Sequence, residues 1–190
     1  MPSDQSVDIS DLVCATESNI ARITAVSGKF AVPCLNEWRY ATKHVALLLK
    51  DPNDSVQREK AIGHLKRAYF DSSDILLTVL LDSLRRVFED VGAYSDIAAK
   101  VIPGYGKWGE VFNDALALQY EPTDDRLTRA RKMDEMSKLI IGFVNQAVAS
   151  RGTLLLAIAR ERSKERWQAI GAIASIAAVL VALASFLWRH

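Results

Sequence analysis

The end of the chain is one uninterrupted apolar segment, and it limits what the whole molecule can fold into. The segment runs from Ala169 to Leu187 and contains only apolar and small residues. About 20 such residues in a helix are long enough to cross the hydrocarbon core of a bilayer. Trp167 and Trp188 flank the segment, as expected at the two membrane interfaces. The alternative is a buried core helix, but such helices are rarely apolar on every side for this length. We therefore predict a transmembrane helix over 167–188.

The charges beside the segment predict its orientation. Only two basic residues, Arg189 and His190, follow the segment. Four basic residues precede it: Arg160, Arg162, Lys164 and Arg166. Lys and Arg accumulate on the cytoplasmic side, so the N-terminus is predicted to be cytoplasmic. Residues 1–10 are polar and acidic and lack the pattern of a secretory signal peptide. We expect a single-pass protein in contact with the lipid bilayer.

Composition excludes several functions. The chain carries 24 Lys and Arg against 23 Asp and Glu, so it lacks the positive charge of a protein that reads duplex DNA. Cys14 and Cys34 are the only cysteines. In a cytoplasmic head we expect both to be buried thiols, and two are too few for a structural zinc site. No pattern of a hydrolase or metalloenzyme is visible, and we expect no metal and no cofactor.

Apolar residues recur at helical spacing through the rest of the chain, which predicts an all-α fold. Helices are expected over about 7–28, from Pro33 onward, from Asp54 to Val91, and over 107–120. The second helix has a stripe that we expect to be buried: Leu35, Trp38, Ala41, Val45 and Leu48. The predicted organisation is a cytosolic helical bundle over 1–122, a long stalk helix over 123–166, the transmembrane helix and a far-side tip at 189–190.

Thr123 is expected to cap the stalk helix. Apolar or small residues alternate there in steps of three and four: Met133, Met136, Ile140, Phe143, Ala147, Ser150, Leu154 and Ala157. This spacing is typical of a coiled-coil seam between copies of the chain. The alternative is that the helix packs inside its own bundle. Gly142 and Gly152 weaken the prediction of a continuous helix.

Small residues share one face of the predicted transmembrane helix: Gly171, Ser175, Ala178, Ala182 and Ser185. Small residues let membrane helices approach closely, so this face suits a homo-oligomer. Two alternatives are a simple tail anchor and the wall of a narrow pore that is closed by dewetting. The span contains no acid or base, which disfavours an ion pump.

Residues 104–109 match the pattern G-x-G-x-x-G of dinucleotide-binding loops. That motif needs a preceding strand, because the phosphate sits where a strand leads into a helix. Here the preceding residues have a helical pattern and end in Pro103. We interpret the motif as a turn before a helix.

Two pairs of arginine and histidine lie in the second and third helices. Arg39 and His44 form an R-x4-H string, and Arg58 and His64 form an R-x5-H string. Together with the segment KAIGHLKRAYFDSSD, they resemble the helical HEPN superfamily over roughly residues 30–90. Many of its members are metal-independent ribonucleases that use such a pair at a dimer interface. The resemblance implies that Arg58 stabilises phosphate charge and His64 acts as acid or base, with Arg39 and His44 as the rival pair.

The same region has two non-catalytic interpretations. Lys60, His64 and Arg67 share one helix face, and antiparallel packing would bring more cations near them: Arg39, Lys43 and Arg58. Such a patch suits a phosphate-rich nucleotide or oligonucleotide. The alternative is an ordinary helix surface, with histidines paired to one of four acids: Glu37, Glu59, Asp71 or Asp74.

In architecture the chain resembles small single-span effectors of bacterial antiphage systems, of the Hailong or cyclic-oligonucleotide type. That resemblance implies a homo-oligomeric membrane effector that forms a pore or channel gated by its cytosolic head. The first alternative is a membrane-tethered HEPN-like ribonuclease. The second is a non-catalytic tail-anchored adaptor.

Overall fold

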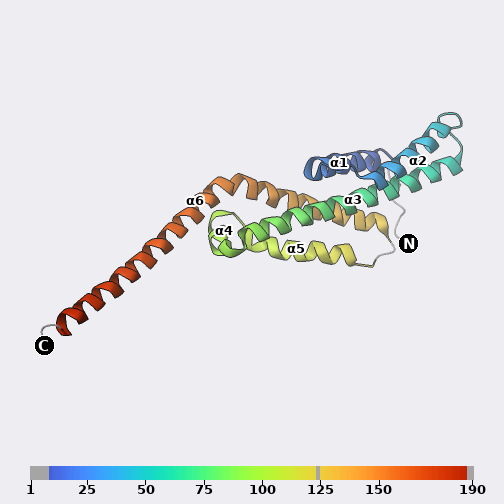
Figure 1. Cartoon of the computed structure of the whole chain (residues 1–190). Helices are drawn as coiled ribbons and strands as arrows, with labels where there is room; N and C mark the ends of the chain where they lie inside the picture. The colour runs from blue at the N-terminus through green and yellow to red at the C-terminus, as the bar shows by residue number, and fades with distance from the viewer. Residues whose placement is uncertain (1–8, 123–124, 188–190) are drawn as a thin grey trace.

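The computed structural model describes residues 9–122 and 125–187, with the backbone alone for 165, 169 and 171–187. All regular structure in these ranges is helical, which confirms the predicted all-α fold (Figure 1). The elements are α1 (Ile9–Ser27), α2 (Val32–Leu48), α3 (Ser55–Val91), the 3-10 turn η1 (Gly92–Tyr94), α4 (Ser95–Val101), α5 (Tyr105–Tyr120) and α6 (Arg126–Leu187).

Helix α3 is the centre of the bundle. It packs against α1, α2, α5 and α6, which lie beside different stretches of its length (Figure 1). Its leucines Leu76, Leu80 and Leu84 are buried in the larger core cluster together with Trp108 and Ile140. A smaller cluster lies at the other end of α3: Leu12, Ala41, Leu65, Tyr69 and Ala130. The repeat of leucines at steps of four therefore places the core along one side of a single long helix.

Two helix starts are fixed by aspartates. Asp54 Oδ1 accepts hydrogen bonds from the backbone N–H groups of Val56 and Gln57, both at 3.0 Å, so α3 begins where the sequence predicts. The predicted cap Thr123 lies outside the described residues. Asp125 caps α6 instead, accepting from the N–H groups of Leu127 and Thr128 at 3.0 and 3.2 Å.

The buried stripe of α2 begins one residue earlier than predicted. Cys34 is fully buried, whereas Leu35 is 39% exposed. Cys34, Trp38 and Ala41 keep the four–three spacing of one helix face, and Leu35 is turned about 100° away from it. The prediction is therefore wrong for Leu35 and confirmed for Ala41. The other three residues of the stripe are half-buried: Trp38, Val45 and Leu48. The cysteine prediction holds for Cys34 and is wrong for Cys14, which is exposed; both are free thiols.

The three–four stripe of α6 packs inside the chain's own bundle. Met133 and Ile140 are fully buried and Leu154 nearly so, while Met136 and Phe143 pack against the same core. Of the two alternatives in the sequence, the intramolecular one is therefore correct for this stripe. The helix is continuous through Gly142 and Gly152. It leaves the bundle beside α4 and continues alone toward the C-terminus (Figure 1).

Among the described residues, α6 is the one helix long and apolar enough to cross a membrane, judged by length and composition alone. That stretch lies within Arg126–Gln168. The backbone of α6 is helical to Leu187. The side chains of the predicted small-residue face lie outside the described part of the structure: Gly171, Ser175, Ala178, Ala182 and Ser185. Trp188 and the tip at 189–190 also lie outside it.

A polar network ties α6 to α1 and α3. Asn19 Nδ2 donates to Asp134 Oδ1 at 2.9 Å and to Ser73 Oγ at 3.1 Å. Ser73 Oγ donates to Asp134 Oδ1 at 2.9 Å, and Tyr69 OH donates to Asp134 Oδ2 at 2.7 Å. Burial and the neighbouring Asp134 raise the pKa of Tyr69, so the phenol stays a donor. Each polar group in this network is thus satisfied by a residue of another helix.

We expect Asp134→Ala to lower the free energy of unfolding by about 2–4 kcal/mol, because Ser73 and Tyr69 lose their acceptor and Asn19 loses one of its two acceptors. Asp134→Asn keeps the shape and one acceptor and should cost less. Glu135→Ala removes an exposed carboxylate from the same turn of α6 and is the matched control. Urea unfolding of the three variants measures the difference. Equal effects of Asp134→Ala and Glu135→Ala would contradict a role for the network.

Candidate functional site

The predicted basic residues lie along an antiparallel pair formed by α2 and α3. Glu37 in α2 contacts His64 in α3, and His44 Nδ1 lies 2.6 Å from Gln57 Oε1. The later of the two α2 residues therefore meets the earlier of the two α3 residues, so the helices run antiparallel, as the predicted cluster requires. Both pairs are symmetric about the turn at residues 50–51.

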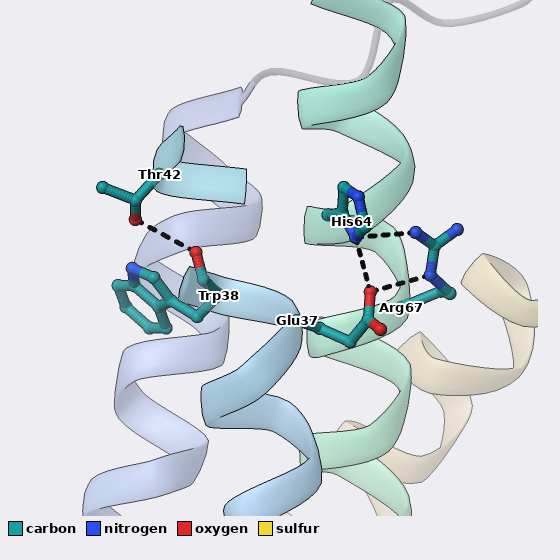
Figure 2. Close-up of polar contacts among 5 residues, drawn as sticks. All are labelled: Glu37, Trp38, Thr42, His64 and Arg67. Atoms are coloured by element: carbon teal, nitrogen blue, oxygen red, sulfur yellow. Dashed lines mark hydrogen bonds and ion pairs between the residues drawn. The ribbon is translucent and has the colours of Figure 1, made fainter. Parts of the chain in front are cut away.

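The centre of this site is formed by Glu37, His64 and Arg67, here called the Glu37 cluster (Figure 2). Arg67 Nε donates to Glu37 Oε2 at 2.8 Å, and His64 Nδ1 lies 2.8 Å from the same oxygen. Arg67 Nη2 lies 2.7 Å from His64 Nδ1. Glu37 comes from α2, and the two basic residues come from successive turns of α3 (Figure 2).

The proton on His64 decides which of these contacts is a hydrogen bond. When Nδ1 carries a proton, it donates to Glu37 and cannot accept from Arg67. When Nδ1 is bare, Arg67 donates to it and the contact with Glu37 joins two acceptors. The partner of His64 therefore depends on the tautomer of its ring.

The charges of the cluster favour the ionised form of Glu37. Its partial burial acts against ionisation, but the hydrogen bonds from His64 and Arg67 outweigh it and hold the pKa of Glu37 below its usual range. The charge of Glu37 has the opposite effect on the neighbouring carboxyl group of Asp71. Burial, followed by the negative charge of Glu37, raises the pKa of Asp71.

Aromatic rings cover the cluster. The His44 ring stacks on the His64 ring with centroids 5.3 Å apart and planes 10° apart. The Tyr40 ring lies 5.4 Å from His64 on a tilted plane, and the Arg39 guanidinium lies 5.2 Å from the centroid of Tyr40. His64 thus contacts two rings, and 20% of its side chain is exposed. This leaves a narrow part of the imidazole open to solvent.

The structure places Arg67, rather than Arg58, beside His64. Arg58 is exposed and its Nη2 donates to the Pro52 carbonyl at 3.4 Å, near the start of α3. Six residues along a helix correspond to about 9 Å of rise and a turn of about 240°, so Arg58 and His64 point to different sides. The pair implied by the HEPN resemblance is therefore not brought together within this chain. Of the four acids considered as partners of the histidines, Glu37 is the one that pairs with His64.

Within the described chain, the remaining predicted cations make no hydrogen bond or ion pair with the Glu37 cluster. Lys43 and Lys60 are exposed, and neither has an ion pair with a described residue. Neither Gln57 nor Tyr40 was predicted as a partner of a histidine. The position of Gln57 follows from the antiparallel pairing about the α2–α3 turn, which places residue 57 opposite His44. The contact of Tyr40 with His64 does not follow from this pairing.

Two other predictions concern ligands. The described residues contain no group of His, Cys, Asp or Glu that could hold a metal ion. Gly104 has a positive φ of 72° and immediately precedes α5, whereas Gly106 and Gly109 lie inside that helix. The G-x-G-x-x-G pattern is therefore a helix start, as predicted, and the described chain has no strand before it.

Comparison of the chain with protein-family models, with curated proteins and with solved structures gives no match.

The Glu37 cluster predicts a pH dependence. The ionised Glu37 stabilises the fold above the pKa of an unfolded glutamate, about 4.3, and this contribution is lost as the pH falls through the lower folded value. We therefore expect the free energy of unfolding to fall below about pH 4 more steeply in the wild type than in Glu37→Gln. Urea unfolding across this range tests it, with Glu59→Gln as an exposed control on α3. Parallel pH profiles for wild type and Glu37→Gln would contradict the assignment.

Proposed function

We propose that this protein is a membrane effector in which copies of α6 assemble into a pore that the cytoplasmic bundle gates. The observation that supports it is the continuity of α6, which is one helix from Arg126 to Leu187. Met133 and Ile140 fix its first part in the core, and the same helix continues into the apolar segment. A helix held at one end by the bundle and at the other by a bilayer transmits rotation or displacement between them.

Self-association is supported by a second apolar face on α6, here called the outer stripe. It consists of Val148, Gly152, Leu155 and Ala159, spaced by four, three and four residues. Val148 is 69% and Leu155 56% exposed, and a Cβ added at Gly152 would meet nothing within 4 Å. Anchored copies share one orientation in the membrane, so their outer stripes run parallel and are able to pack together. We therefore assign a second copy of the chain to this face.

The trigger in this proposal is a phosphate-rich ligand bound along α2 and α3. Arg39, Lys43, Arg58 and Lys60 are exposed there, and none has an ion pair among the described residues. Helix α3 carries the effect of binding, because it contacts both α2 and α6. An antiphage role in a bacterial inner membrane is the setting that this architecture favours.

Charge placed on the outer stripe tests the assembly. We expect the full chain to depolarise cells that express it, and Leu155→Glu to abolish both depolarisation and oligomers in detergent, because burying an unpaired carboxylate is unfavourable. Thr153→Glu adds the same charge to the same turn at an exposed position outside the stripe, and it should behave as wild type. A voltage-sensitive dye and mass photometry are the measurements. Normal oligomers in Leu155→Glu would refute this interface.

The small-residue face in the span provides a separate test of the pore. We expect Ala178→Leu to block conduction, because a larger side chain keeps neighbouring spans apart. Ala177→Leu is the matched control, since it adds the same volume one position outside that face. Depolarisation by both variants at the wild-type rate would contradict a pore built on this face.

A membrane-tethered ribonuclease is the second candidate, and the position of Arg67 beside His64 favours it. In this version Arg67 takes the role that the resemblance assigns to Arg58. His64→Ala would then abolish RNA cleavage, and a chain ending at Arg166 would keep it. Cleavage that survives His64→Ala would eliminate this candidate.

A further inference from the structure

A groove of about 630 Å³ lies between the η1–α4 segment and the part of α6 that leaves the bundle. One wall comes from Tyr94, Ile97 and Lys100, and the other from Ala157, Arg160 and Lys164. Lys164 lies five residues before Ala169, which is about 7.5 Å along a helix. The groove is therefore next to the segment that we propose to enter the membrane.

The groove is lined by three basic residues, Lys100, Arg160 and Lys164, and by two acidic ones. Its acidic lining residues are Asp96 and Glu161, and Glu161 Oε2 is already paired with Lys164 Nζ at 3.2 Å. Lys100 and Arg160 have no ion pair within the described part of the chain. They come from opposite walls, one from α4 and one from α6. Two such cations form a site for a group with at least one negative charge.

A contact beside the groove holds its two walls together. Arg162 Nε donates to Tyr94 OH at 2.7 Å, and the Arg162 guanidinium lies 5.2 Å from the centroid of the Tyr94 ring. This contact joins η1 to α6 at one edge. Ile97 and Val101 are partly buried against the core and add apolar surface to the same groove. The groove thus has both basic and apolar lining residues, and the contact between Arg162 and Tyr94 joins its two walls.

We infer that this groove binds the phosphate of an anionic phospholipid headgroup. The inference rests on the proposed membrane segment, because only an anchored chain holds the groove at headgroup level. A soluble phosphate ester offers the same charge, but the position of the groove beside the proposed span favours a lipid. Basic residues next to a span attract anionic lipids in general. Here Lys100 and Arg160 confine that attraction to one site.

The purified full chain in detergent, titrated with phosphatidylglycerol or phosphatidylcholine and examined by native mass spectrometry, tests the inference. We expect it to retain one phosphatidylglycerol per chain and to show no comparable retention of phosphatidylcholine. Lys100→Ala and Arg160→Ala should each weaken retention by about tenfold, as expected for loss of one charge-assisted contact. Arg166→Ala removes the same charge nearer to the predicted span but outside the groove lining, so it should retain the lipid.

Three results would overturn the inference. Equal losses in Arg160→Ala and Arg166→Ala would show a diffuse surface charge instead of a site. Equal retention of the two lipids would exclude headgroup recognition. Displacement by glycerol phosphate at similar concentration would assign the groove to a soluble phosphate ester. Two further assays separate this inference from the proposed function: alkaline extraction tests whether the chain is anchored in the membrane, and the depolarisation assay tests conduction. A chain that is anchored and conducts, but binds both lipids equally, refutes the lipid site and leaves the proposed pore standing.

Discussion

The Asp134 carboxylate, held by donors from α1 and α3, fixes the position of α6, on which the rest of the molecule depends. Apolar packing of Met133 and Ile140 favours burial of this face of α6, but a leucine-rich partner offers similar contacts after a shift of one turn. The carboxylate does not tolerate that shift, because its donors Asn19, Ser73 and Tyr69 would lose their acceptor. The network therefore selects one register among several apolar ones.

That register determines what α6 presents outside the bundle. Once the buried face is set, the outer stripe with Val148 and Leu155 points away from the core. The same rotation places Arg160 in the groove beside α4. A single helix thus contributes core, an exposed apolar face, one wall of a cationic groove and the predicted span. In the proposed function, a movement of the bundle displaces all four of these features together, because they lie on one continuous helix.

The Glu37 cluster lies on the α2–α3 pair, and α3 is the element that joins it to α6. His64 has two competing partners, Glu37 and Arg67, and its proton chooses between them. The rings of Tyr40 and His44 pack on the same imidazole and so add contacts between α2 and α3.

The sequence by itself determined the helical class, most helix limits and the long apolar segment, because these depend on local signals. The period of apolar residues, Pro33 at a helix start and the Asp54 cap all act within a few residues. Periodicity also showed that α6 has a buried face. It did not identify the partner, since a coiled-coil seam and a bundle face have the same spacing. Only the tertiary structure decided that this face packs on α3, that Arg67 lies beside His64, and that Asp134 joins three helices. Those outcomes depend on residues far apart in the chain, whose relative position is fixed by packing.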